Sequence, residues 1–139
     1  MSAFEPAFAP EHVRTEGWDL WMSSPARGVF VSRASGHLDL AAAKALFDRF
    51  DQVMAQHTPV LGFHDWRKVT GYDAEARQEY VRRVKGRPPE VALVHVLVGS
   101  KLLAMGAQVV KLLVGSTLTV YSDEAPFGHA RAAALASRR

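Results

Sequence analysis

The side chains best placed for chemistry are His64 and Asp65, in the stretch His64-Asp65-Trp66-Arg67. A histidine beside a carboxylate can act as a general base or as an oriented ligand. Neighbouring residues of a strand point to opposite faces, so these two side chains form no dyad unless the strand bulges. The favoured interpretation is packing, with Phe63 and Asp65 on one face and His64 and Trp66 on the other. A role at the rim of a binding site, shared with Arg67, stays open.

Ser100 and Lys101 form a second candidate site, in Val98-Gly99-Ser100-Lys101. Here a predicted strand ends and a helix begins, and the free N–H groups of a helix start attract anions. The stretch lacks the glycine spacing of a phosphate-binding loop, and the chain contains no G-x-G-x-x-G. We therefore expect Ser100 to be an ordinary helix cap, with an anion or nucleotide site as the alternative.

The six histidines match no metal motif. None pair four residues apart on a helix, H-E-x-x-H is missing, and the chain has no cysteine. Neither a metal nor another cofactor is expected. His95 stands inside an apolar stretch and is expected to be a hydrogen-bonded core residue. A G-x-S-x-G hydrolase motif is also missing. No catalytic residue is assigned, and the sequence predicts a protein that is not an enzyme.

From Gly17 onward, turn-forming residues separate the strands and helices that must position these side chains. The first two strands pair as a hairpin, and helical spacing of apolar residues after Asp39 predicts an amphipathic helix through His57. Asp39, Asp73 and Ser100 are predicted helix caps. The expected strands are 18–24, 28–34, 60–66, 91–98 and 117–121, and the expected helices are 39–57, 73–86, 101–114 and 124–136.

This β-β-α-β-α-β-α-β-α order predicts an α/β fold with a mixed, mostly parallel five-stranded sheet. Residues 91–98 form an almost unbroken β-branched run, which is typical of a strand covered on both faces. Residues 1–16 are expected to be a loosely ordered arm, and residues 17–139 a single domain.

The composition is that of an ordinary globular protein of 139 residues, 48% hydrophobic and 22% charged. No apolar run reaches the ~18 residues of a membrane span. The first ten residues lack the pattern of a secretion signal, so a cytoplasmic location is expected. The net charge is only +3, and the basic runs at 82–87 and 138–139 are interpreted as a solvated helix end and a tail. Nucleic acid is therefore an unlikely partner.

The layout resembles the STAS-like domains, the anti-sigma-factor antagonist group and its bacterial relatives, which are related in fold to CRAL-TRIO lipid-binding domains. The resemblance covers residues 17 to 136 and rests on the element order and two stretches. These are Leu61-Gly-Phe-His-Asp-Trp-Arg-Lys-Val-Thr-Gly71 and Thr119-Val-Tyr-Ser-Asp-Glu-Ala-Pro-Phe-Gly-His-Ala-Arg-Ala-Ala133. It implies a regulatory domain that works through protein contacts.

One departure from that family concerns its phosphorylated serine, which lies in an Asp-Ser-Ser-Gly motif after the third strand. The corresponding loop here reads Val69-Thr70-Gly71-Tyr72-Asp73 and holds no serine. Thr70 and Tyr72 offer hydroxyl groups outside the motif, so the phosphorylation switch is not transferred. Both remain candidate contacts for a ligand or partner.

The predicted helix 101–114 is more apolar than its fold requires. A helix on one face of a sheet needs an apolar stripe of about 100°. Here Lys101, Gln108 and Lys111 leave only a narrow polar stripe. Either the first or the last helix covers the surplus, or a second copy does, or it is exposed as a partner or membrane surface. Intramolecular or homodimer burial is favoured, which makes Met105, Val109 and Leu113 candidate contacts.

The sequence as a whole predicts a non-enzymatic STAS-like regulatory module that acts through protein–protein contacts and homodimerisation. The alternative is a domain that binds an apolar ligand or a lipid surface.

Overall fold

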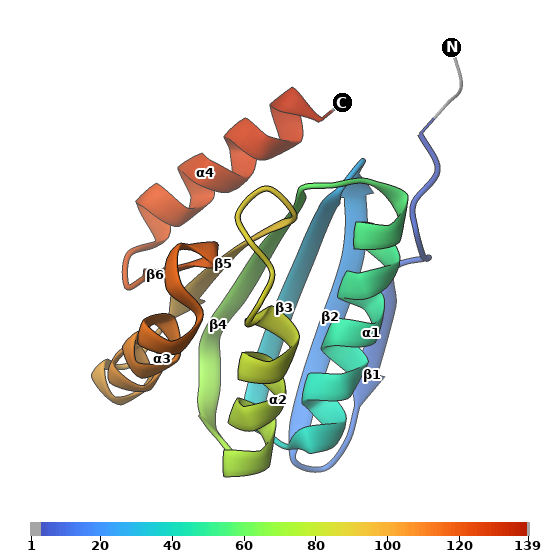
Figure 1. The fold of residues 1–139 in the computed structure, drawn as a ribbon. Helices are drawn as coiled ribbons and strands as arrows, with labels where there is room; N and C mark the ends of the chain where they lie inside the picture. Colours follow the sequence, from blue (N-terminus) through green and yellow to red (C-terminus); the bar gives the residue numbers. More distant parts are fainter. Residues whose placement is uncertain (1–3, 139) are drawn as a thin grey trace.

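The computed structural model describes residues 4–138, which form a single six-stranded sheet and four α-helices. Helices α1, α2 and α3 lie on one face of the sheet, and α4 lies on the other (Figure 1). The strands are β1 (Glu11–Arg14), β2 (Trp18–Ala26), β3 (Val29–Leu38), β4 (Val60–Tyr72), β5 (Ala92–Val98) and β6 (Leu118–Tyr121). The helices are α1 (Leu40–Gln56), α2 (Ala74–Val84), α3 (Lys101–Val114) and α4 (Glu124–Ser137).

The strands lie side by side in chain order, β1-β2-β3-β4-β5-β6. The pairings β1–β2 and β2–β3 are antiparallel, and β3–β4, β4–β5 and β5–β6 are parallel. The predicted mixed, mostly parallel sheet is confirmed. As predicted, β5 has neighbours on both faces, because Val96 belongs to the core under the helices and Leu97 to the core under α4.

The sheet has six strands instead of the five expected, and the additional one is β1. It lies in the segment 1–16 that the sequence assigned to a loose arm. Its residues, Glu-His-Val-Arg, show too little apolar alternation to predict a strand. The strand forms because its backbone pairs with β2, where Glu11 lies opposite Met22 and Arg14 opposite Asp19.

Strand β4 is also longer than the predicted 60–66. It runs beside β3 as far as Tyr72, which pairs with Leu38, and register shifts near Ser35 and His37 keep the two strands together. Because the register shifts interrupt the alternation of apolar and polar residues, the sequence does not show that β4 continues beyond residue 66. The strand now includes Thr70 and Tyr72, which the sequence placed in a loop.

Two of the three predicted helix caps are confirmed. Asp39 Oδ1 accepts a 2.9 Å hydrogen bond from the Ala42 N–H, and Ser100 Oγ accepts one of 3.1 Å from the Leu103 N–H. Asp73 precedes α2 but makes no side-chain cap. Its carboxylate instead forms a 2.6 Å hydrogen bond with His37 Nε2, because the end of β3 lies next to the start of α2.

The two faces of the sheet bury separate cores. Phe30, Phe50 and Val53 pack in the larger core, under α1 to α3, and Phe63 and Phe127 pack in the smaller core, under α4. Strand alternation divides the residues between the faces. On β2 the residues Trp18, Leu20 and Met22 point to the larger core, so Trp21 points away from it and is 45% exposed.

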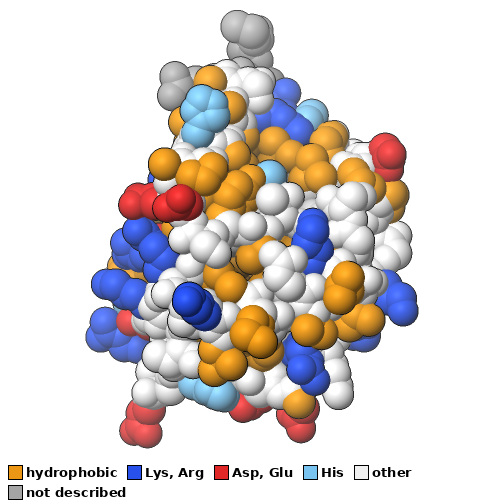
Figure 2. Space-filling view, turned by 90° about the vertical axis from the view of Figure 1, so that its left-hand side faces the viewer, with side chains coloured by type: hydrophobic (Ala, Val, Ile, Leu, Met, Phe, Trp, Pro, Cys, Tyr) orange, Lys and Arg blue, Asp and Glu red, His pale blue; other side chains and the backbone are white. Residues whose placement is uncertain are grey.

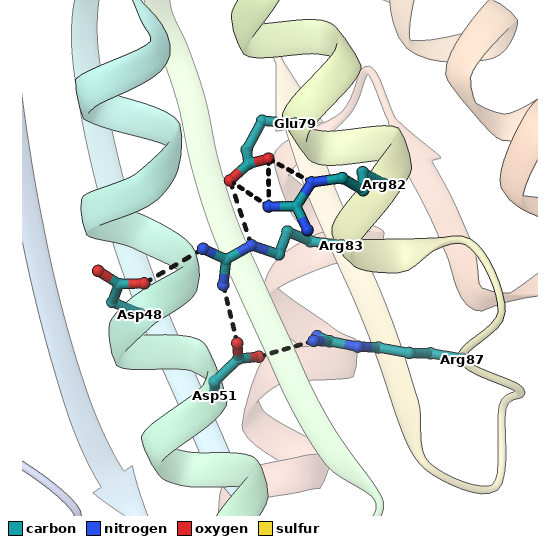
Figure 3. Close-up of polar contacts among 6 residues, drawn as sticks. All are labelled: Asp48, Asp51, Glu79, Arg82, Arg83 and Arg87. Carbon is teal, nitrogen blue, oxygen red and sulfur yellow. Dashed lines mark hydrogen bonds and ion pairs between the residues drawn. The ribbon is translucent and has the colours of Figure 1, made fainter.

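A network of ion pairs holds α1 against α2 (Figure 3). The Arg83 guanidinium contacts Asp51 at 2.9 Å, Asp48 at 3.3 Å and Glu79 at 3.2 Å. Arg82 also donates to Glu79, and Arg87 pairs with Asp51 at 2.9 Å. Burial acts to raise the pKa of Glu79, but the hydrogen bonds and charges of Arg82 and Arg83 outweigh it and lower that pKa. The carboxylate therefore stays charged inside the helix pair.

Candidate functional site

His64, Trp66 and Tyr72, three of the predicted site residues, line one apolar pocket between the sheet and helices α2 and α3. The cavity measures about 70 Å³. Its walls come from β4, β5 and the inner sides of α1, α2 and α3, and include Leu46, Phe47, Tyr80, Val94, Val96, Val98, Leu103, Ala107, Val110 and Val114. Arg77 is the one lining residue among these elements with a charged side chain.

His64 is buried at the base of this pocket and is only 4% exposed. Its Nδ1 shares a 2.6 Å hydrogen bond with the Ser32 hydroxyl, which is itself buried. Burial, aided by the nearby His95, lowers the pKa of His64 to about 3. The imidazole is therefore neutral at physiological pH, and its hydrogen bond with Ser32 ties β3 to β4.

Asp65 lies on the opposite face of the sheet from His64, as strand alternation predicts. It accepts hydrogen bonds from Arg67 Nε at 3.0 Å and Arg67 Nη2 at 2.7 Å. These bonds from Arg67 lower the pKa of Asp65 despite its partial burial. Arg67 also reaches Glu124 at 3.1 Å. The side chains of Asp65 and Arg67 thus lie away from the pocket that His64 and Trp66 line, although these four residues are consecutive in the sequence.

Tyr72, which lines the pocket, lies against α3. A side chain at Gly106 would overlap the Tyr72 hydroxyl, so glycine is what lets strand β4 and helix α3 approach this closely. Trp66, another lining residue, packs on Tyr80 with ring centroids 5.2 Å apart. Among the described residues no acceptor meets the buried Trp66 Nε1–H.

The remaining predicted site residues lie outside the pocket. Thr70 is exposed on β4. Ser100 and Lys101 are exposed at the start of α3, where the Ser100 hydroxyl already accepts from the helix backbone. Met105, Val109 and Leu113 are 67%, 50% and 54% exposed on the outer side of α3.

Helix α3 leaves most of its apolar surface uncovered. Of its 14 residues, all within the described range, Leu103 alone is buried. Of the alternatives that the sequence left open, coverage of the surplus by the first or last helix is wrong. Helix α1 packs on α2, and α4 lies across the opposite face of the sheet, so neither reaches the outer side of α3. Figure 2 views the molecule from the side of α3 and α4 and shows hydrophobic side chains at the surface with basic ones among them.

His95 is hydrogen bonded as expected, although it is only partly buried. Its Nδ1 forms a 2.9 Å bond with the Tyr121 hydroxyl, and its ring stacks on Phe63 with centroids 4.7 Å apart. Burial lowers the pKa of His95. Residues 4–138 contain no cluster of three or more potential metal ligands. Within the same range, no helix has the length and apolar content to cross a membrane.

Sequence reasoning missed three residues. Arg77 and Ala107 line the pocket because α2 and α3 face each other, a tertiary relationship with no local signal. Trp21 lies on the other face of the sheet, where it lines a shallow hollow, and its exposure there was predictable. Because Trp18, Leu20 and Met22 are apolar at alternate positions, a tryptophan at 21 must point to the other face.

Comparisons with known proteins identify the fold. No family model and no curated protein matches the chain. One similar solved structure is an uncharacterized protein of the DUF3478 family with a SpoIIAA-like fold, from Shewanella loihica PV-4. It has a TM-score of 0.56 and 12% identity over 93% of this chain and 97% of that one. Another is an anti-sigma factor antagonist from Mycobacterium paratuberculosis, with a TM-score of 0.53 and 15% identity over 88% of this chain and 92% of that one. The chain therefore has the STAS-like fold that its sequence predicts.

Proposed function

We propose that this STAS-like chain is a non-enzymatic regulatory module that acts through protein–protein contacts and pairs with a second copy of itself through α3. The fold is that of an anti-sigma factor antagonist among other proteins, which supports a regulatory role. The positions of the polar groups support a non-enzymatic one, because His64 and Asp65 face opposite sides of the sheet and Ser32 is buried.

The observation that carries the pairing proposal is the spacing of the exposed residues on α3. Leu102, Met105, Val109 and Leu112 follow each other at intervals of three, four and three residues and are between 50% and 86% exposed. This spacing forms the narrow apolar seam by which two helices pack together. An apolar surface of this kind on a single helix marks an interaction site.

The charges on α3 also favour a second copy as the partner. The helix contains no carboxylate, and its two lysines are Lys101 at the first position and Lys111 near the end. Lys111 is turned inward, where its ammonium donates to the Leu118 carbonyl. The seam itself is therefore uncharged, and two copies related by a two-fold axis would bury it against itself without burying a charge.

Size-exclusion chromatography with light scattering tests this proposal at micromolar concentrations. The expected mass is twice the 15.3 kDa of the chain. Leu112→Glu should give a monomer, because it places a charge within the proposed interface. Gln108→Glu adds the same charge to an exposed position on α3 outside the seam, and should leave the dimer intact. A monomeric native chain, or equal effects of the two substitutions, would contradict the pairing.

A second candidate function, the binding of an apolar ligand, is favoured by the pocket under α3. Its lining is almost wholly apolar, and the unpaired Trp66 Nε1–H could donate to one acceptor on a ligand. The cavity, at about 70 Å³, is larger than a single water molecule requires. It is smaller than the ~150 Å³ of an apolar cavity that binds benzene. A short apolar group would fit without rearrangement, whereas a lipid chain requires α3 to move.

Native mass spectrometry of freshly purified protein tests the ligand proposal. A co-purified adduct that is lost in Ala107→Trp, which fills the pocket, would support it. Sedimentation with liposomes tests the lipid-surface form of the same idea, with Leu112→Glu as the variant expected to stay in solution. An adduct-free protein that does not sediment with liposomes would rule out both forms.

A further inference from the structure

The face of the sheet opposite α3 is only half covered. Helix α4 packs on β5 and β6 and leaves the outward residues of β2, β3 and the end of β4 in contact with solvent. Three adjoining hollows of about 300, 330 and 260 Å³ follow this face, and all three share Arg33. We refer to them together as the sheet groove. One wall is Trp21 of β2, and the other is Arg131 of α4.

The sheet groove carries positive charge that the protein does not neutralise. Arg33, Lys68 and Arg131 line it, and none of them forms an ion pair with any residue in the described range 4–138. The two carboxylates that line the groove already have ion-pair partners within the protein. Asp65 pairs with Arg67, and Asp19 pairs with His12 and Arg14. A ligand that enters the groove therefore meets three cations that form no ion pair with a described residue, although Arg33 and Arg131 each lie over an aromatic ring.

The spacing of two of these cations follows the strand repeat. Val31, Arg33 and Ser35 are alternate residues of β3 and share the outward face, about 6.6 Å apart. Lys68 of β4 pairs in register with Ser35, so Arg33 and Lys68 lie one two-residue step apart along the sheet. Arg131 lines the same groove from α4. An extended peptide with carboxylates at alternate residues presents anions at the same interval.

The surroundings of Trp21 favour a peptide over a nucleic acid. Single-stranded nucleic acids bind sheet faces by stacking bases on exposed aromatic rings. Here the Trp21 ring is already stacked on His12, with centroids 3.7 Å apart, and the Arg33 guanidinium lies over it at 5.6 Å. A base would have to displace one of these neighbours, whereas a peptide needs only the edge of the indole.

We propose that the sheet groove binds an extended acidic peptide segment of a partner protein, whose alternate carboxylates pair with Arg33 and Lys68 while Arg131 attracts a further carboxylate from the side of α4. This surface lies on the opposite face from α3, so it can operate in the monomer or in a pair.

Nuclear magnetic resonance titration of ¹⁵N-labelled protein tests the proposal with an unlabelled peptide of four Glu-Thr repeats. The Trp21 indole N–H and the amides of Arg33 and Lys68 should shift in a saturable manner. In Arg33→Glu/Lys68→Glu the Kd should rise by about tenfold or more, since like charges then face the peptide. The control Lys44→Glu/Lys85→Glu makes the same change in net charge at exposed positions outside the groove and should keep the native Kd.

Several results of this titration would overturn the proposal. One is an absence of shifts at the groove residues in a protein whose spectrum shows the native fold. Another is equal weakening by the two double variants, which would mean that only net charge matters. Equal binding of a Gln-Thr repeat peptide would show that the carboxylates are not recognised. Tighter binding of an eight-nucleotide oligothymidylate at the same residues would assign the groove to nucleic acid instead.

Discussion

The Tyr72 hydroxyl occupies the space that a side chain at position 106 would need, so strand β4 and helix α3 meet at a glycine. Tyr72 also lines the apolar pocket, and its contact with Gly106 limits how closely α3 lies on the sheet. Substitutions at positions 72 and 106 should therefore have coupled effects on stability.

Gly106→Ala should destabilise the native chain, because the new methyl group overlaps the Tyr72 hydroxyl and overpacking costs about 1–3 kcal/mol. In a Tyr72→Phe background the hydroxyl is missing and the nearest ring carbon would lie 3.3 Å from the new methyl group, so the same substitution should destabilise the chain much less than it does in the native background. Urea unfolding of the four variants measures this coupling. An identical effect of Gly106→Ala in both backgrounds would show that the two residues are independent.

The buried His64 predicts how stability depends on pH. Its pKa is about 3 in the folded chain and ordinarily 6.5, so below pH 6.5 the unfolded chain takes up a proton that the folded chain does not. The free energy of unfolding should therefore fall with decreasing pH, by at most about 1.4 kcal/mol per pH unit from this group.

Denaturant titrations between pH 7 and pH 4 test this dependence. His64→Gln should flatten the profile, because it removes the group that binds the extra proton on unfolding. His129→Gln, at an exposed position on α4, controls for the loss of a histidine as such. A native slope in His64→Gln would mean that other groups account for the acid sensitivity.

Because of the ion-pair network between α1 and α2, substitutions of the neighbouring residues Arg82 and Arg83 should lower the free energy of unfolding by different amounts. Arg83→Met should lower the free energy of unfolding by about 1–3 kcal/mol, because it removes a partner of the buried Glu79 and both contacts to α1. Arg82→Met also removes hydrogen bonds to Glu79, but its side chain is 66% exposed and makes no contact with α1, so it should cost less than Arg83→Met. Thermal or urea unfolding distinguishes them, and equal costs would contradict the role given to Arg83.

Most of the fold was predictable because its signals are local. The helical spacing after Asp39, the caps at Asp39 and Ser100, and the β-branched run 91–98 each depend on residues within one or two turns of chain. The strand β1 was missed because it has no such pattern and forms only by pairing with β2. The end of β4 was missed for a similar reason, since it is maintained by β3 across register shifts.

The candidate sites were only partly predictable, because they depend on which face of the sheet each helix covers. Alternation correctly separated His64 from Asp65. It could not show that α4 takes the opposite face from the other three helices, which leaves α3 uncovered and places Arg131 beside Arg33. Such placements arise from the packing of the whole sheet, and no single stretch of sequence encodes them.

Chemical cross-linking through a single introduced cysteine tests the pairing through α3 most directly, since the chain has no cysteine of its own. Val109 lies in the exposed seam, and a two-fold axis near the middle of α3 would bring it close to Val109 of a second copy. Val109→Cys, treated with a short bis-maleimide at low micromolar concentration, should be captured rapidly as a covalent dimer. Lys44→Cys, exposed on α1, should remain a single chain under the same conditions. Equal capture of the two variants, or a Val109→Cys protein that stays a single chain, would contradict the proposal that this module pairs through α3.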